Sequence, residues 1–320
     1  MPSSQFILGE TEGAPAAPLL TPEEIQRISL DVIAEMSRHY VTRGELRVTA
    51  ENVYQPAVTA GRAILETFQQ RLFLAGSGVD GLDRLERCLA DMERGRRVLF
   101  LSEHRGNLDA PSLNALLRSA GDRYVPLLDK LVYVAGRKLS ESSDFINMFA
   151  EKYSRIVIVP RREYPPLEKN ETDAERTARE AFEAEARRIN WAAFRAMEKL
   201  KRQGYVMVLF PTGGRIKPGE HNRPVKETTS YMRSFDTAYL IAMEGNTLPP
   251  LDVMEDERPV QAKVLFRVGE PLECKAFLAE RKRAFEKAGP TPEAEDFDQF
   301  VANGIIAMLA KLCETGAYDS

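Results

Sequence analysis

The spacing of apolar positions changes several times along the chain, and each spacing predicts a kind of element. In the segment 21–40, apolar residues recur every three or four positions, which predicts an amphipathic helix. Thr21 suits its N-cap, Pro22 suits the first helical position, and Glu24 completes a capping box. A second helical pattern runs from Ile64 to Phe73. The first 75 or so residues therefore predict a small helical unit without a strand.

Beyond residue 81, helical stretches alternate with short apolar runs. The runs are almost continuously apolar, as is typical of strands that helices cover on both faces; they comprise residues 96–102, 130–136, 155–160, 205–211, 238–244 and 260–268. Helical patterns cover residues 82–95, 171–204 and 296–314, and the many charges of 171–204 indicate a solvated face. This alternation predicts an α/β fold with a mixed, largely parallel central sheet flanked by helices.

Three segments are expected from these patterns. Residues 1–20, rich in Ala, Pro, Ser and Gly, are predicted to form a mobile N-terminal tail. Residues 21–77 are predicted to form a smaller N-terminal helical domain, and residues 78–320 the α/β domain.

Composition narrows the class of protein. The net charge of the 320 residues is −4, which argues against a dedicated nucleic-acid binder. Cys88, Cys274 and Cys313 are far apart and have no metal-ligand spacing, which favours a reducing cytoplasm over a disulfide framework. We find no secretory signal pattern and no apolar run near the roughly 18 residues that span a bilayer. We therefore expect a cytoplasmic protein, with any lipid contact peripheral to the inner face of the membrane.

Several common motifs are absent or stand in the wrong context. Gly76–Gly81 matches G-x-G-x-x-G, but a helical pattern precedes it where a dinucleotide site needs a strand, so a flexible junction is the better interpretation. The chain has no G-x-x-x-x-G-K-[ST] and no G-x-S-x-G sequence. Its three histidines lack H-x-x-x-H spacing, so no metal site is expected, and His39 and His221 fit surface positions.

The stretch from Val98 to Leu117 suggests chemistry. An apolar run leads to His104, and Asp109 follows five positions later, at the start of a helical pattern. In open α/β sheets, ligands bind beyond the carboxyl ends of the strands. A carboxylate beside an imidazole fixes its tautomer and stabilises the imidazolium, so His104 is a candidate general base. The alternative is that Asp109 only favours a helix N-terminus and His104 is an ordinary loop residue.

Two other predicted strand ends carry positive charge. The run 155–160 is followed by Arg161 and Arg162, and the run 205–211 is followed by Thr212, Gly213, Gly214, Arg215 and Lys217. Glycines after a buried strand let backbone amides approach an anion, and arginine and lysine complete a phosphate cradle. If the three strand ends meet at one edge, the sequence predicts a base beside a phosphate pocket. The alternative is that the arginines are merely solvated.

The order of these motifs resembles that of a known family. HRGNLD (104–109) resembles the H-x4-D signature of glycerolipid acyltransferases. LFPTGGR (209–215) resembles their second signature, in the form found in soluble chloroplast-type glycerol-3-phosphate acyltransferases, with Thr212 in place of the usual glutamate or serine. YLIAMEGNTLPPL (239–251) is similar to the apolar segment with paired prolines that follows in that branch. The resemblance covers residues 98 to about 272.

This resemblance implies an activity for the domain 78–320. His104 would deprotonate the 1-hydroxyl of glycerol 3-phosphate, Asp109 would orient the imidazole, and the product would be lysophosphatidate for phospholipid synthesis, formed without a covalent acyl-enzyme. No cofactor is implied, and the acyl thioester would come from acyl carrier protein or coenzyme A. An acidic carrier would be steered to a basic surface, for which the loop 217–226 is a candidate. The substrate phosphate would be bound by Arg161, Arg162, Arg215 and Lys217, with the backbone amides of Gly213 and Gly214.

Three other interpretations stay open at this point. The same signatures serve acylation of lysophosphatidate, although that branch usually has membrane-spanning segments. A histidine phosphoesterase would need a second catalytic histidine near His104. A non-catalytic module that binds a phosphometabolite or a lipid would keep the pocket without turnover.

Overall fold

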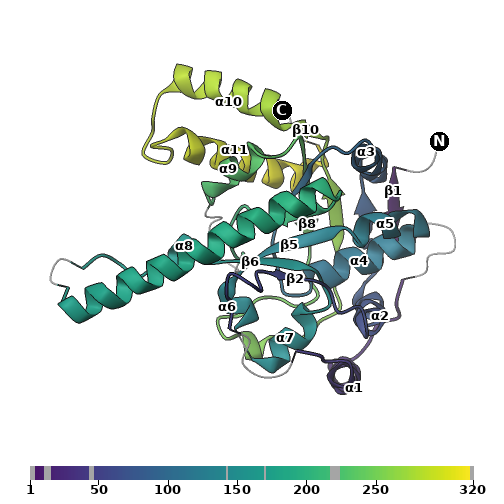
Figure 1. The fold of residues 1–320 in the computed structure, drawn as a ribbon. Helices are drawn as coiled ribbons and strands as arrows, with labels where there is room; N and C mark the ends of the chain where they lie inside the picture. Colours follow the sequence, from purple (N-terminus) through teal and green to yellow (C-terminus); the bar gives the residue numbers. More distant parts are fainter. Residues whose placement is uncertain are drawn as a thin grey trace.

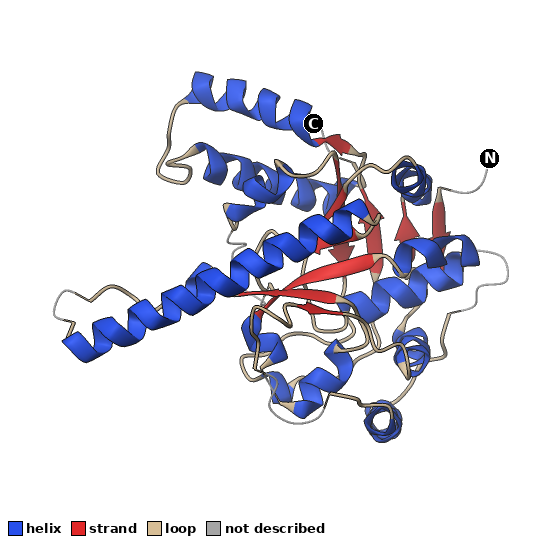
Figure 2. Ribbon diagram, in the orientation of Figure 1, coloured by secondary structure: helices blue, strands red, loops and turns tan. Residues whose placement is uncertain are grey.

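The computed structural model describes residues 4–10, 16–42, 47–141, 143–168, 171–216 and 224–317. Within these ranges, ten strands form one mixed sheet that helices cover on both faces (Figures 1 and 2). Neighbouring strands follow the order β1-β3-β9-β8-β4-β7-β5-β6-β2, and β10 pairs with β8. The five strands β8, β4, β7, β5 and β6 are mutually parallel, whereas β9 is antiparallel to β8. The predicted mixed, largely parallel α/β sheet is confirmed.

All six predicted apolar runs contain strands, β4 to β9. The strands are β1 (Gln5–Ile7), β2 (Tyr54–Gln55), β3 (Gly78–Asp80), β4 (Val98–Ser102), β5 (Leu131–Gly136), β6 (Arg155–Ile158), β7 (Val206–Leu209), β8 (Thr237–Glu244), β9 (Leu265–Val268) and β10 (Leu272–Glu273). The prediction that the first 75 or so residues contain no strand is wrong, because β1 and β2 lie there. Strands of two or three residues are too short for a pattern to reveal.

The helical patterns also appear as helices, and Thr21 forms the predicted capping box with Glu24. The helices are α1 (Pro22–Arg38), α2 (Arg62–Leu72), α3 (Leu82–Glu93), α4 (Asp109–Ala120), α5 (Val125–Leu128), α6 (Arg137–Ser140), α7 (Asp144–Ala150), α8 (Asp173–Arg202), α9 (Glu227–Met232), α10 (Cys274–Ala288) and α11 (Phe297–Thr315). In the part of the chain described, no helix is long and apolar enough to cross a membrane.

Alternate strand residues point to opposite faces of the sheet and build two apolar cores. Phe100 of β4 packs into one core with side chains of α1 to α5. Its neighbour Leu99 packs into the other core with side chains of α8 to α11. Met36 of α1 and Leu65 of α2 belong to the same core as Phe100. A separate domain over residues 21–77 stays a prediction, but its helices share a core with the sheet.

The N-terminal segment closes both edges of the sheet. β1, which lies in the segment expected to be a mobile tail, pairs antiparallel with β3, and β2 pairs antiparallel with β6 at the opposite edge. The Gln261 side chain also accepts a hydrogen bond from the backbone N–H of Leu20 (2.8 Å). The interpretation of Gly76–Gly81 as a flexible junction is wrong, because this stretch contains β3, which has a partner strand on each side.

Candidate active site

Three strand ends that carry candidate residues meet at one edge of the sheet. β4, β7, β5 and β6 are adjacent and parallel, so their carboxyl ends lie side by side. His104 follows β4, Arg215 follows β7, and Arg162 follows β6. The predicted meeting of the strand ends at one edge is therefore confirmed. We call this edge the carboxyl rim.

His104 is bound to Asp109 as the spacing suggested. The ring Nδ1 lies 2.9 Å from Oδ2 of Asp109, and the same oxygen accepts the backbone N–H groups of Arg105 (2.7 Å) and Gly106 (3.0 Å). Asp109 is the buried first residue of α4, whereas the His104 side chain is 20% exposed. When Nδ1–H donates to the carboxylate, Nε2 carries the lone pair. The pair thus has the arrangement of an oriented base.

Two contacts join the loop after β4 to the loop after β7. The ring of Phe210 stacks on His104 with centroids 4.2 Å apart and an interplanar angle of 17°. The backbone N–H of Ile216 donates to the carbonyl of His104 at 2.9 Å. The base is therefore attached, through the backbone and through its ring, to the segment that carries the second motif.

Arg215 reaches the first motif through a buried acid. Its guanidinium forms an ion pair with Glu257, whose carboxylate also accepts a hydrogen bond from the Asn107 side chain at 3.3 Å. The Glu257 side chain is 2% exposed and that of Arg215 is 16% exposed. Because Asn107 follows His104 by three positions, this network holds Arg215 close to the base. Sequence reasoning missed Glu257, since one acid within MEDER (254–258) looks like a solvated loop residue.

The two arginines after β6 point in different directions. A Cβ added at Gly214 would lie 3.0 Å from Nη1 of Arg162, and one added at Gly213 would lie 3.7 Å from it, so this guanidinium rests against the glycine turn after β7. The Arg161 side chain is 87% exposed and pairs with Glu227 of α9 at 3.7 Å. The structure thus brings Arg162, and not Arg161, to the second motif.

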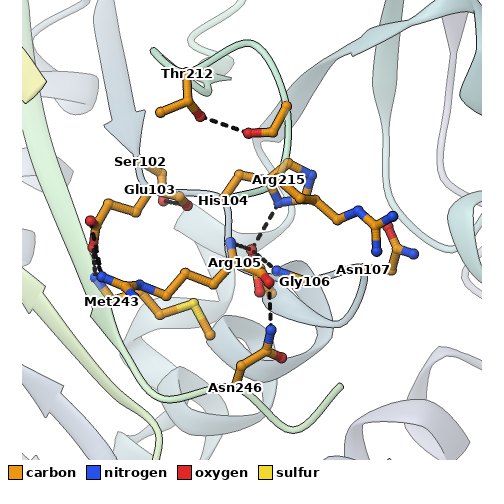
Figure 3. Close-up of polar contacts among 12 residues, drawn as sticks. Ser102, Glu103, His104, Arg105, Gly106, Asn107, Thr212, Arg215, Met243 and Asn246 are labelled. Atoms are coloured by element: carbon orange, nitrogen blue, oxygen red, sulfur yellow. Dashed lines mark hydrogen bonds and ion pairs between the residues drawn. The ribbon is translucent and has the colours of Figure 1, made fainter. Parts of the chain in front are cut away.

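The geometry of the turn after β7 accounts for Gly213 and Thr212 in the second motif. Gly213 has a φ of +65°, which favours glycine, and its N–H donates to the carbonyl of Phe210 at 2.8 Å. That amide, one of the two expected to bind an anion, already has a partner within its turn. The Thr212 hydroxyl donates to the carbonyl of Gly214 at 2.7 Å, a bond that an ionised glutamate could not donate (Figure 3). Lys217 lies outside the described residues, as does most of the loop 217–226.

Behind the base, a second buried acid supports the first motif. Burial raises the pKa of Glu103, whose carboxylate accepts hydrogen bonds from the backbone N–H of Met243 (2.7 Å) and from Arg105 (3.2 Å). The Asn246 side chain donates to the carbonyl of Arg105 at 2.5 Å. A Cβ added at Gly106 would lie 2.8 Å from the backbone carbonyl oxygen of Leu248 and 2.5 Å from Nδ2 of Asn246, so this position of the motif has room only for glycine.

Two other hollows lie in the described part of the chain. A hollow of about 390 Å³ lies along α8, and one of about 220 Å³ is lined by Tyr133 and Tyr153, but His104 lines neither of them. Among the residues that the structure describes, no three side chains of His, Cys, Asp or Glu gather as a metal site would require. The cysteines are free thiols, and only Cys313 is partly exposed.

An α/β sheet with an oriented histidine at its carboxyl rim, flanked by cations on neighbouring strand ends, is suited to general-base catalysis beside an anionic group. The family model Acyltransferase matches residues 79–243, a little over half of the chain, and the chain therefore belongs to the acyltransferase family. The matched region begins in β3, ends in β8 and contains both motifs. A search of curated proteins found no match. The match is to acyltransferases in general and supports acyl transfer in glycerolipid synthesis; the glycerol-3-phosphate branch is a narrower assignment.

Proposed function

We propose that the protein transfers an acyl group from an acyl thioester to the 1-hydroxyl of glycerol 3-phosphate, giving lysophosphatidate. The observation that carries the proposal is the hydrogen bond from Ile216 N–H to the His104 carbonyl, because it joins the base to the loop of Arg215. Glycerol 3-phosphate has its phosphate and its 1-hydroxyl at opposite ends of a three-carbon chain. A phosphate held by the loop after β7 would leave that hydroxyl within reach of Nε2 of His104.

The proposed reaction proceeds by general-base catalysis. Nε2 of His104 takes the hydroxyl proton while the oxygen attacks the thioester carbonyl. Collapse of the tetrahedral intermediate leaves the new C–O bond and breaks the C–S bond, and the imidazolium returns the proton to the departing thiolate. Asp109 holds the ring and stabilises the imidazolium. The donor is the thioester of acyl carrier protein or coenzyme A, and no cofactor takes part.

Arg162 and Arg215 are the cations that we assign to the phosphate. The charge of Arg215 is balanced by Glu257, so Arg215 contributes its remaining N–H groups. Arg162, which lies over the glycine turn, supplies the net positive charge. Guanidinium groups suit this role because their planar N–H groups match phosphate oxygens in pairs. We leave Arg161 out of this assignment, because its side chain pairs with Glu227 of α9; the assignment of Lys217 remains a prediction from the sequence.

The direct test is incubation of the purified protein with an acyl thioester and glycerol 3-phosphate, followed by measurement of thiol release and of the lipid formed. His104→Ala should lower turnover by about 10²-fold or more while glycerol 3-phosphate still binds. Lysophosphatidate as the only effective acceptor would overturn the assignment of the acceptor. No thiol release with either acceptor would instead favour a binding module.

The adjacent arginines provide a matched pair of variants for the phosphate site. Arg162→Ala should raise the KM for glycerol 3-phosphate by about 10- to 100-fold, the value of a charge-assisted hydrogen bond, and leave the KM for the donor nearly unchanged. Arg161→Ala removes the same charge one residue away and should change the acceptor KM by less than about two-fold, since this side chain faces α9. Equal effects of the two variants would contradict the assignment of the phosphate site.

A further inference from the structure

An aromatic pair is exposed on the outer face of α8. Trp191 is 61% exposed and Phe194 is 45% exposed, and their rings stack with centroids 5.6 Å apart. The opposite face of the same helix is buried, with Ile189 and Met197 packed in the core. Because the two rings stack on each other, they form one contiguous exposed apolar patch, which marks a candidate contact surface.

Three cations continue the same face toward the C-terminal end of the helix. Arg195, Lys199 and Arg202 follow Trp191 at helical spacing and are exposed. Together with Trp191 and Phe194, we call them the outer stripe of α8. No ion pair joins these three cations to an acid of the described chain; the acid among them, Glu198, pairs with the buried Lys201. The hollow of about 390 Å³ is lined by Arg195, Lys199 and Arg202, together with Glu198 and Gln203.

The cationic part of the outer stripe runs away from the carboxyl rim. Within α8, Asn190 binds the backbone of Val159, just past the carboxyl end of β6. The helix ends at Arg202, shortly before β7 begins at Val206, so the cations run toward the amino ends of the strands. An acyl carrier that docked there would hold its thioester at the edge opposite His104. The donor of the reaction is therefore a poor occupant of this surface.

Charge and shape fit a lipid surface better. α8 is a straight rod on the outside of the sheet, and its C-terminal half, which carries the outer stripe, lies over the sheet (Figure 1). Long cationic side chains without fixed partners suit a mobile layer of lipid phosphates, which attracts Lys and Arg close to the membrane. Tryptophan and phenylalanine on a basic helix settle at the level of the headgroups.

We propose that the outer stripe of α8 binds the surface of an anionic bilayer. Trp191 and Phe194 enter the headgroup region, and Arg195, Lys199 and Arg202 bind lipid phosphates. The surface lies on the face of the sheet away from α4, so binding leaves the carboxyl rim accessible to soluble substrates. The proposal does not depend on which acceptor the enzyme uses.

The single tryptophan of the chain makes the test direct. Emission from the full-length protein is recorded with vesicles of phosphatidylcholine alone and with vesicles that contain phosphatidylglycerol. We expect a blue shift only with the anionic vesicles, reversal by added salt, and quenching by lipids with brominated acyl chains. A lack of quenching by anionic brominated vesicles, or an equal shift with neutral vesicles, would overturn the proposal.

Matched triple variants test the cations. One triple variant combines Arg195→Gln, Lys199→Gln and Arg202→Gln. It should partition into anionic vesicles about 100-fold more weakly than the wild type, since each cation near an anionic membrane contributes about five-fold. Replacing three exposed cations of α10 by glutamine makes the same change in net charge and should alter partitioning less than about two-fold; these are Lys282, Arg283 and Lys287. Equal losses in both variants would show that only net charge matters. An emission shift with soluble polyglutamate but none with vesicles would identify an acidic protein as the partner instead, and would also overturn the proposal.

Discussion

Asp109→Asn tests the geometry around the base, because it keeps the size of the side chain and removes its charge. In the structure, one oxygen of Asp109 accepts three hydrogen bonds, from the His104 ring and from two backbone amides. An asparagine can place either its oxygen or its NH2 group at that point. The NH2 group would face the two backbone N–H donors and forfeit both bonds, so we expect the oxygen to stay there. The proton would then remain on Nδ1, and Nε2 would remain a base.

The expected loss of activity follows from that orientation. At the observed 2.9 Å, the attraction between imidazolium and carboxylate is at most about 6 kcal/mol at an effective dielectric constant of about 20. Solvent screens part of it, since His104 is 20% exposed, and the hydrogen bond itself survives in the variant. A charge-assisted bond exceeds a neutral one by about 1–2 kcal/mol, so kcat should fall about 5- to 30-fold. Loss of the tautomer in a serine-protease triad costs about 10⁴-fold by comparison.

The assay is thiol release at saturating glycerol 3-phosphate, with His104→Ala measured in parallel. A loss in Asp109→Asn as large as in His104→Ala would refute the reasoning, because it would mean that the amide had turned. No loss at all would mean that the ring never becomes charged in the reaction. The variant places an NH2 group at the other buried oxygen position, which has no partner, and this should cost about 1–3 kcal/mol of stability. Activities are therefore compared well below the unfolding midpoint.

Two further predictions concern buried and surface ion pairs. Glu257→Gln should lower the free energy of unfolding by about 1–3 kcal/mol, because Arg215 loses its counter-ion. Glycerol 3-phosphate should raise the urea midpoint of unfolding more in the variant than in the wild type, since its phosphate can replace the lost charge. An equal rise in both proteins would contradict phosphate binding at Arg215. The hydrogen-bonded Arg97 guanidinium lowers the pKa of Asp236 from 3.8 to about 2, so this pair stabilises the fold above about pH 4 and its contribution is lost as the pH falls toward 2. Asp236→Asn should therefore cost up to about 1 kcal/mol at pH 7, because both side chains are partly exposed. The cost should shrink steadily between about pH 4 and pH 2 and disappear below the folded pKa. A urea midpoint deficit that does not shrink over this range would contradict the sign.

The main strands were predictable because strands buried on both faces need continuous apolar runs. β4 to β8 are such runs, and their order along the chain already implied a largely parallel sheet. β1, β2 and β3 could not be found in the same way, since two or three residues carry no periodic signal. Their position depends on pairing with strands far away in the sequence, and pairing leaves no local pattern.

The site residues that directly follow a strand could be predicted from the sequence, because the ends of parallel strands lie at one edge of the sheet. His104 and Arg215 stand at such ends, and the structure joins their loops directly. Phe210 was not singled out, because an apolar residue at a strand end looks like any core residue. Arg161 and Arg162 look equivalent in the sequence, yet one pairs with α9 and the other lies against the glycine turn. Side-chain direction in a short loop depends on neighbours that a sequence does not place.

The two short strands of the N-terminal segment have a practical consequence for handling the protein. β1 and β2 are the two outermost strands of the sheet, one at each edge. A fragment trimmed to residues 78–320 would leave unpaired amide and carbonyl groups on β3 and β6, ready to recruit another chain. Such a fragment should precipitate or self-associate instead of yielding a compact catalytic core.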